Sequence, residues 1–251
     1  ISRLGFKAMI VANWKNAGSK ELIKVWVDSV SKDIDIVQGK DCVFCPPTCY
    51  LDYSKDYIKQ RNKDIRIGSQ ELDSELTSPL TGAISSQMLA DLGCEFVIIG
   101  HSEQRLHLNE SNEILSNKLL KAVERDIIPI FCIGETKSEK ESDLTKKVLS
   151  KQLDAIHTDL TSKCIIAYEP VWAIGTGDYA EISLIEKIHV HIKEYIMNKT
   201  KSSNQISVVY GGSVNLENYK EIYSSTQVDG LLIGGASLDA NTFTEIYNMS
   251  Q

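Results

Sequence analysis

The chain has 251 residues, enough for one or two domains and also the usual size of a parallel α/β barrel that forms one domain. About 42% of the residues are hydrophobic and only 5 are prolines, which excludes disordered, collagenous and low-complexity proteins. The net charge of -7 argues against nucleic-acid binding, because an acidic protein repels the phosphate backbone. A small anionic ligand would need local backbone dipoles and one or two cations instead.

Short apolar runs recur along the chain, and each is followed by a longer segment with helical spacing. Continuous apolar runs indicate strands that are buried on both faces, as in a parallel sheet covered by helices. Residues 182–197 give the clearest helix, with Ile185, Ile188, Ile192 and Tyr195 on one face. The eight runs lie at residues 6–12, 42–45, 65–68, 95–100, 127–134, 164–169, 206–211 and 230–234.

Eight strand-helix units without a linker rich in Gly, Pro or Ser predict an α/β protein with a single (β/α)8 barrel domain over residues 1–251. The alternative is an open doubly wound sheet, which would require a GxGxxG turn after the first strand. Here the first run is followed by NWKNAG instead. The barrel is therefore preferred, and its active site is expected at the carboxyl ends of the strands.

Polar residues follow three of these runs. Asn13 and Lys15 come after the first, and the two-residue period of a strand puts them on one face with Trp14 on the other. His101 follows the fourth run near the expected start of a helix, whose dipole would keep the ring neutral. Glu169 ends the sixth run. Each of them alone is also explained by an ordinary role, as a surface lysine, a packed histidine or a helix-capping carboxylate.

Glycine-rich segments follow the last two runs. Residues 211–213 read GGS and residues 234–235 read GG, which lets backbone N–H groups approach an anion closely. Barrels often bind phosphate at this place, beside a short helix. The apolar loop PVWAIGTG at 170–177 is unusual for a solvated connection, and we interpret it as a lid. Together these segments predict a phosphate site.

With these residues in place, the sequence resembles the triosephosphate isomerase family over essentially the whole chain. The resemblance implies interconversion of D-glyceraldehyde 3-phosphate and dihydroxyacetone phosphate by proton transfer through an enediolate, as in glycolysis and gluconeogenesis. It implies no cofactor and no metal. The shared motifs are NWK at 13–15, GHSE at 100–103, CIGE at 132–135, AYEPVWAIGTG at 167–177, YGGSV at 210–214 and IGGASL at 233–238.

The resemblance also implies roles for individual residues. Glu169 would be the base, and neutral His101 would polarise the carbonyl and move protons between its oxygens. Lys15 would supply positive charge, and Asn13 would help to fix this end of the pocket. The residues implied to bind the substrate are Asn13, Lys15, Gly175, Ser213, Gly234 and Gly235.

Supporting roles are implied for residues around the lid at 170–180. Tyr210 and Ser213 would hold the closed lid, whereas Trp172 would contact Glu135 when the lid is open. Glu103 would order Lys15. Cys132, in the CIGE motif, completes the supporting set.

Several positions depart from the usual family pattern. Ala83 stands where an acid is usual and Gln104 where a base is usual, and we expect that relatives form a charge pair there. Residues 178–180 read Asp-Tyr-Ala instead of Lys-Thr-Ala, which would alter the stiffness of the lid hinge.

The resemblance further implies a homodimer. A loop at about 71–85, with Thr81 at its tip, would insert beside the partner's active site, and Asn16 lies in the loop expected to receive it. No membrane or nucleic-acid partner is expected.

Competing interpretations remain at this point. Another phosphosugar barrel is disfavoured because it would not combine NWK, GHSE and AYEPVW, and a silent scaffold barrel would be expected to have lost Lys15, His101 or Glu169. A metal site at Cys42 and Cys45 is disfavoured because the two thiols would point to opposite faces of a strand. The short apolar run at the start resembles neither a signal peptide nor a membrane span, so we expect a cytoplasmic protein.

Overall fold

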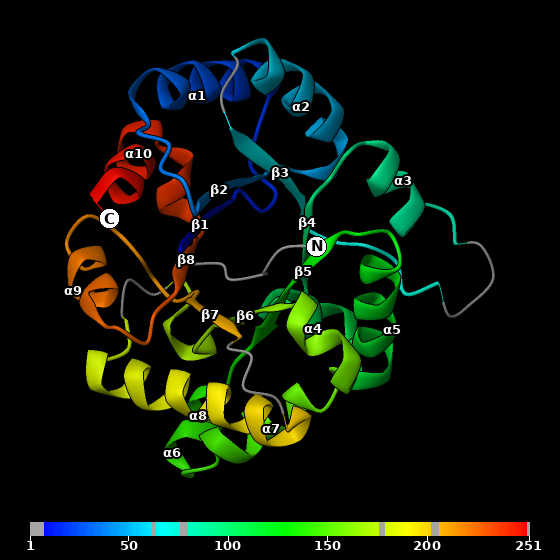
Figure 1. Ribbon diagram of the computed structural model, residues 1–251, viewed down its shortest axis with the longest axis vertical. Coiled ribbons are helices and arrows are strands. Elements are labelled where there is room, and N and C mark those ends of the chain that lie inside the picture. Colours follow the sequence, from blue (N-terminus) through cyan, green and yellow to red (C-terminus); the bar gives the residue numbers. More distant parts are fainter. Residues whose placement is uncertain (1–7, 62–63, 76–79, 176–178, 202–205, 250–251) are drawn as a thin grey trace.

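The computed structural model describes residues 8–61, 64–75, 80–175, 179–201 and 206–249. Its eight strands are all parallel and form a closed barrel in chain order, with β1 paired to both β2 and β8 (Figure 1). Each predicted apolar run overlaps one strand, so the predicted (β/α)8 barrel is confirmed. The strands are β1 Ala8–Asn13, β2 Lys40–Cys45, β3 Ile65–Ser69, β4 Phe96–Ile99, β5 Ile128–Ile133, β6 Ile165–Tyr168, β7 Ser207–Tyr210 and β8 Gly230–Ile233.

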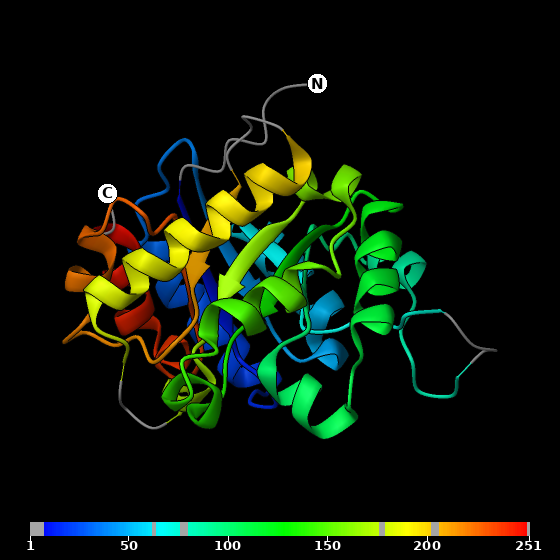
Figure 2. The ribbon, with the colours of Figure 1, turned by 90° about the horizontal axis from the view of Figure 1, so that it is seen from below.

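Helices surround the barrel and run along its wall (Figure 1, Figure 2). The predicted helix at 182–197 is the longest, Ile182–Thr200. The α-helices are α1 Lys20–Asp33, α2 Leu51–Gln60, α3 Ser86–Asp91, α4 Ser102–Leu108, α5 Asn112–Val123, α6 Lys137–Glu141, α7 Thr145–Leu153, α8 Ile182–Thr200, α9 Tyr219–Ser224 and α10 Ala240–Met249. Short 3-10 helices are η1 Thr48–Tyr50, η2 Thr158–Lys163, η3 Val171–Ala173 and η4 Gly235–Leu238.

Several helices begin at a hydroxyl residue that the sequence places immediately before them. The side-chain oxygens of Ser19, Ser85, Ser111 and Thr136 each accept a hydrogen bond from the backbone N–H three residues later. Such a cap satisfies one of the N–H groups that the first turn leaves without a partner, and it typically contributes about 1 kcal/mol. These caps fix where the helices start after the loops at the carboxyl end of the barrel.

The core has two layers, which follow from the alternation of side chains along each strand. Met9 and Val11 point into the barrel, whereas Ile10 and Ala12 pack outward against the helices. The same alternation separates Cys42 from Cys45, which lie in the outer and inner layers respectively. Among the described residues, no group of three or more His, Cys, Asp or Glu side chains is arranged to hold a metal ion.

An aromatic cluster anchors the end of β1. Trp14 packs edge-on against Phe44, with ring centroids 4.8 Å apart, and Trp26 of α1 stacks on the same ring at 4.6 Å. Both indole N–H groups donate to the carbonyl oxygen of Ser237 in η4. Trp14 is therefore buried behind the strand, as predicted, and its neighbours Asn13 and Lys15 face the other way.

One segment leaves the side of the barrel. Residues 71–75 and 80–85 project away from the wall between β3 and α3, and both views show this (Figure 1, Figure 2). Leu80 and Thr81 are exposed there. No helix in the described part of the chain is both long enough and apolar enough to cross a membrane.

Candidate active site

A cavity of about 300 Å³ opens at the carboxyl ends of the strands. Its wall comes from the residues that follow β1, β4, β6, β7 and β8, which is where a parallel barrel concentrates its loops. The structure brings together all of the residues that the sequence assigns to catalysis and substrate binding. They are Asn13, Lys15, His101, Glu169, Gly175, Ser213, Gly234 and Gly235.

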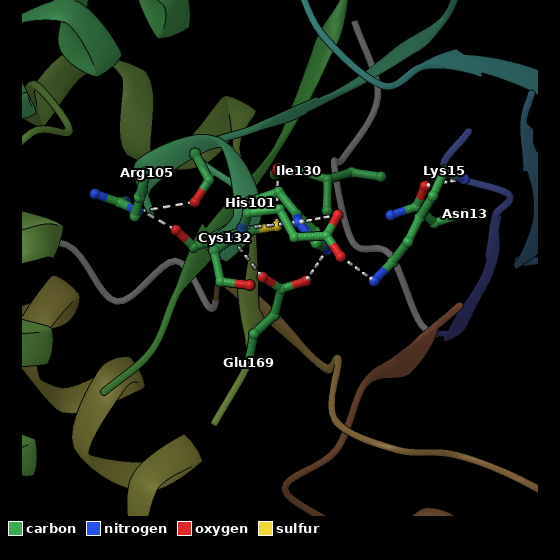
Figure 3. A network of polar contacts seen from close by, with 10 residues as sticks. Asn13, Lys15, His101, Arg105, Ile130, Cys132 and Glu169 are labelled. Carbon is green, nitrogen blue, oxygen red and sulfur yellow. Dashed lines mark hydrogen bonds and ion pairs between the residues drawn. The ribbon is translucent and has the colours of Figure 1, made fainter. Parts of the chain in front are cut away.

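Glu169 and His101 face each other inside this cavity (Figure 3). The Oε1 atom of Glu169 lies 3.3 Å from Nε2 of His101, and Oε2 accepts a hydrogen bond from the backbone N–H of Ser102 at 3.3 Å. Only 2% of Glu169 is exposed. A carboxylate in this position has one oxygen held by the backbone and the other directed at an imidazole.

The orientation of His101 is set by the start of α4. His101 is the N-cap residue, as the sequence predicts, and its Nδ1 accepts a hydrogen bond from the N–H of Glu103 at 3.3 Å. The carboxylate oxygen Oε2 of Glu103 also lies 3.5 Å from Nδ1, but the N–H group already occupies this acceptor. A neutral ring held in this way carries its proton on Nε2, the nitrogen that faces Glu169.

Lys15 brings positive charge to the opposite wall. Its Nζ forms an ion pair with Oε1 of Glu103 at 2.6 Å, and its backbone N–H donates to Oδ1 of Asn13 at 3.1 Å. Burial alone would raise the pKa of Glu103, but the hydrogen bond from Lys15 and nearby positive charge outweigh it and lower that pKa. Lys15 has a φ of 52°, a left-handed conformation that costs a lysine backbone free energy.

The end of β5 holds the backbone of Glu169 in place. The backbone N–H of Glu169 donates to the carbonyl oxygen of Ile133 at 2.8 Å. A Cβ atom on Gly134 would lie 1.7 Å from the backbone oxygen of Glu169, so only glycine fits there. Burial, followed by the Glu169 carboxylate, raises the pKa of the Cys132 thiol well above its usual value. Cys132 is therefore a neutral thiol beside the carboxylate.

The far side of the cavity has the features of an anion site. Gly234 and Gly235 lead into the short helix η4, whose first N–H groups have no partner within the helix. Ser213 lies opposite, and its hydroxyl donates to the carbonyl oxygen of Ala173 at 2.6 Å. Gly175, with a φ of 71°, borders the same space.

The described ends of the predicted lid are held by several contacts. Trp172 Nε1 donates to Oε1 of the fully buried Glu135 at 2.9 Å, and the Nζ of Lys140 lies 3.3 Å from the centre of a Trp172 ring. Burial raises the pKa of Glu135, and the hydrogen bond from Trp172 opposes this effect. At the other end, the N–H of Ala180 donates to the hydroxyl of Tyr210 at 3.1 Å.

Two of the three residues at 178–180, where the sequence departs from the family pattern, belong to the described part of the chain. Tyr179 donates a hydrogen bond to Oε2 of Glu221 in α9 at 3.2 Å, a contact that the sequence did not reveal. Asp178 lies outside the described residues. The predicted effect on the hinge therefore stays a prediction.

Other residues of the site were also missed by the sequence reasoning. A Cβ atom on Gly211 would lie 2.8 Å from Cγ of Glu169, so this glycine makes room for the carboxylate. Asn215 lines the cavity, and Arg105 donates to two backbone oxygens beside it. The glycine pair after β7 was a usable signal for Gly211, but nothing in the sequence indicated where the Arg105 side chain would lie.

The closed barrel with a carboxylate, an imidazole and an ammonium group at its carboxyl end places the chain among the α/β-barrel enzymes. A sequence model of the family described as triosephosphate isomerase matches residues 8–250. Similar proteins named triosephosphate isomerase include one from Baumannia cicadellinicola subsp. Homalodisca coagulata, 39% identical, and one from Photorhabdus laumondii subsp. laumondii, 38% identical. Each alignment covers 95% of this chain and 94% of the relative.

The chain belongs to the triosephosphate isomerase family, and it is an isomerase. The family resemblance predicted from the motifs and the predicted reaction, the interconversion of triose phosphates, are thus confirmed.

Proposed function

We propose that Glu169 and His101 carry out the isomerisation of D-glyceraldehyde 3-phosphate and dihydroxyacetone phosphate inside the cavity described above. The observation that carries this proposal is the 3.3 Å approach of Glu169 Oε1 to His101 Nε2 in a largely buried site beside Lys15. A base and a proton donor at this separation can act on adjacent atoms of one small substrate.

The reaction requires one proton to leave a carbon atom and another to return to the neighbouring carbon. Glu169 removes the proton from the carbon beside the carbonyl, which leaves negative charge on the carbonyl oxygen. The Nε2–H group of His101 and the ammonium group of Lys15 stabilise this charge, because preorganised donors act strongly in a site with little water. The hydroxyl proton of the first carbon passes through Nε2 of His101 to the former carbonyl oxygen, and Glu169 then returns its proton to the former carbonyl carbon. No net change of oxidation state occurs.

The glycine-rich side of the cavity is proposed to bind the substrate phosphate. Backbone N–H groups at Ser213, Gly234 and Gly235, assisted by Gly175 and Lys15, supply the local positive field that the acidic chain lacks overall. Asn13, whose side chain is held by the Lys15 N–H, keeps this part of the wall in place. Inorganic phosphate is therefore expected to compete with the substrate.

The test of the base is Glu169→Gln, compared with Glu95→Gln at the opposite end of the barrel. Glutamine keeps the shape but cannot remove the proton, so kcat/KM is expected to fall by about 10³- to 10⁴-fold. The Glu95 variant should retain the native value. A Glu169→Gln enzyme within about tenfold of the native kcat/KM would contradict the assignment, because a general base contributes more than this.

We further propose that the chain forms a homodimer through the projecting segment. A second hollow of about 400 Å³ adjoins the first cavity, and Asn16, Gln70 and Gln104 lie on its border. The partner subunit's Thr81 would enter this hollow, which would cover exposed apolar surface at Leu80. Light scattering at micromolar concentration should give the dimer mass, and a monomer mass would contradict the proposal.

A cytoplasmic location is the third proposal. All six cysteines are free thiols, and five of them are buried, which suits a reducing compartment. Cell fractionation that places the enzyme with secreted or membrane proteins would contradict it.

A further inference from the structure

Arg105 is a charged residue at the carboxyl end of the barrel that the mechanism above does not use. It lies one turn into α4, four residues after His101. Its Nε donates to the carbonyl oxygen of Gly100, and its Nη2 donates to the carbonyl oxygen of Cys132, both at 2.8 Å (Figure 3). The guanidinium also lies over the ring of Phe131, 5.3 Å from its centre.

The environment of this guanidinium is unusual for a charge. Burial lowers the pKa of Arg105, although arginine stays protonated at neutral pH. The carboxylates of Glu110 and Glu169 attract it, but Arg105 forms no ion pair with a carboxylate among the residues that the structure describes. A buried charge is costly even when hydrogen bonds satisfy its donors. The presence of this guanidinium therefore calls for a structural or functional reason.

The two carbonyl oxygens that Arg105 joins lie immediately beyond the last registered pair of two strands. β4 and β5 are paired up to Ile99 and Phe131, and the next residues along the strands are Gly100 and Cys132. The planar guanidinium spans this gap with two parallel donors, a geometry that lysine cannot reproduce. Arg105 therefore extends the connection between β4 and β5 beyond the point where β4 ends.

This point controls the placement of both reacting side chains. His101 directly follows Gly100, at the end of β4. Glu169 follows β6, and its backbone N–H is bonded to Ile133 of β5 at 2.8 Å. The backbone at both reacting residues is thus connected to β5. Arg105 makes this connection next to His101, and a main-chain hydrogen bond makes it at Glu169.

We propose that Arg105 is a positioning residue for the isomerisation, which holds the end of β4 at a fixed distance from β5 and so sets the separation of His101 from Glu169. The inference rests on the roles proposed above for those two residues. Gly100 supports it independently. Its φ is 70°, and a Cβ atom there would lie 3.0 Å from Nη2 of Arg105, so the strand end leaves space for the guanidinium.

The test compares Arg105→Gln and Arg105→Lys with the same substitutions at Arg66. Arg66 is a matched control because it also lies over an aromatic ring, at 4.6 Å from the centre of Phe96, and also makes hydrogen bonds to two other segments, with Asp41 of β2 and with Glu95 just before β4. It does so at the amino ends of the strands, away from the cavity. The kcat and KM for D-glyceraldehyde 3-phosphate are measured for each folded variant.

For Arg105→Gln we expect kcat to fall by about 30- to 100-fold with KM within about threefold of the native value, since a misplacement of about 1 Å at reacting groups costs about 100-fold. Arg105→Lys should recover part of this loss, because an ammonium group keeps the charge and can reach one carbonyl. The Arg66 variants should keep the native kcat. Equal effects of the substitutions at both arginines on kcat would overturn the proposal.

Chemical rescue separates positioning from a general structural role. Arg105→Ala leaves space for a free guanidinium ion, and millimolar guanidinium chloride should raise its kcat several-fold, whereas equal concentrations of sodium chloride or urea should not. Rescue by all three solutes, or by none of them, would contradict the inference. Failure of every Arg105 variant to fold, where the Arg66 variants fold, would assign the residue to stability alone and overturn it.

Combining Arg105→Gln with Glu169→Gln separates the positioning role of Arg105 from the proposed role of Glu169 as the base. If Arg105 acts through the reacting pair, the double variant should be no slower than Glu169→Gln. An additional loss of the full size in the double variant would overturn the positioning role. A Glu169→Gln enzyme that remains active would instead contradict the proposed function itself.

Discussion

The two ends of the barrel use charged residues in opposite ways. At the amino ends, Arg66 of β3 is bonded to Asp41 and Glu95, and Lys193 pairs with Asp229 just before β8. At the carboxyl ends, Lys15 and Glu169 face a cavity, and Lys15 has a left-handed backbone. Charges at the amino ends are paired with each other, whereas Lys15 and Glu169 at the carboxyl ends also border a space that a substrate can enter.

This difference separates stability from function along the same eight strands. Residues that pair with their neighbours at the amino ends hold the barrel together, and their removal should be felt in the free energy of unfolding. Residues at the carboxyl ends are held in arrangements that cost stability, so their removal should be felt in turnover. The comparison is tested most sharply by variants that change one property and leave the other.

Among variants that leave Glu169 and His101 intact, the largest effect is expected for Lys15→Met at the carboxyl end. Methionine keeps most of the side-chain volume but removes the only lysine charge that lines the described cavity, so kcat/KM should fall by about 10³-fold. The lost ion pair with Glu103 is about half exposed and contributes little to folding. Steady-state assays should therefore show a large loss of kcat/KM, whereas denaturant unfolding should show little change in the free energy of unfolding. A drop in unfolding free energy large enough to explain the lost activity would contradict the separation of function at the carboxyl end from stability at the amino end.

Gly211→Ala should give the next largest effect. The new methyl group would meet Cγ of Glu169 at 2.8 Å and push the carboxylate away from its position. We expect kcat to fall by about 10²-fold with a small change in KM, because the base is misplaced and the phosphate site is not. Kinetic constants for both substrates check this. A change confined to KM would assign Gly211 to phosphate binding alone.

Much of this architecture was predictable because buried segments are apolar, and apolar runs can be recognised in the sequence. The eight apolar runs predict the strands since each is covered on both faces, and alternation within a run correctly separates Cys42 from Cys45. The position of His101 at a helix start also followed from local pattern. The ends of the runs also located Glu169 and the glycine segments after β7 and β8, and the motif resemblance added their roles.

What the sequence could not supply are distances between residues far apart in the chain. The need for glycine at 134 arises from the backbone of Glu169, and the bond from Tyr179 to Glu221 spans 42 residues. The direction of the Arg105 side chain depends on the spacing of β4 and β5, which no local pattern encodes. The charge pair that we expect in relatives at the positions of Ala83 and Gln104 stays a prediction.

Arg66→Met tests the amino end from the side of stability. The substitution leaves Asp41 and Glu95 close together without their shared cation, and both are partly exposed, so we expect a loss of about 2 kcal/mol in unfolding free energy. The kcat/KM should stay at the native value, because Arg66 lies at the end opposite the cavity. Chemical denaturation and assays at the same temperature measure both. Loss of kcat without loss of stability would show that the two ends are not separate.

Lys40→Met should produce the smallest effect and the opposite sign. Burial lowers the pKa of Lys40 to about 8, although its Nζ donates to the carbonyl oxygen of Tyr247 and lies over that ring. Below pH 8 the folded protein holds a buried charge that the unfolded chain exposes to water, so the methionine variant should be more stable there. Between pH 8 and the ordinary lysine pKa of 10.5, the native lysine loses its proton in the folded state only, and its stability rises toward that of the variant. Unfolding free energies of both proteins across this range should therefore converge as the pH increases, and a constant difference would show that Lys40 titrates normally.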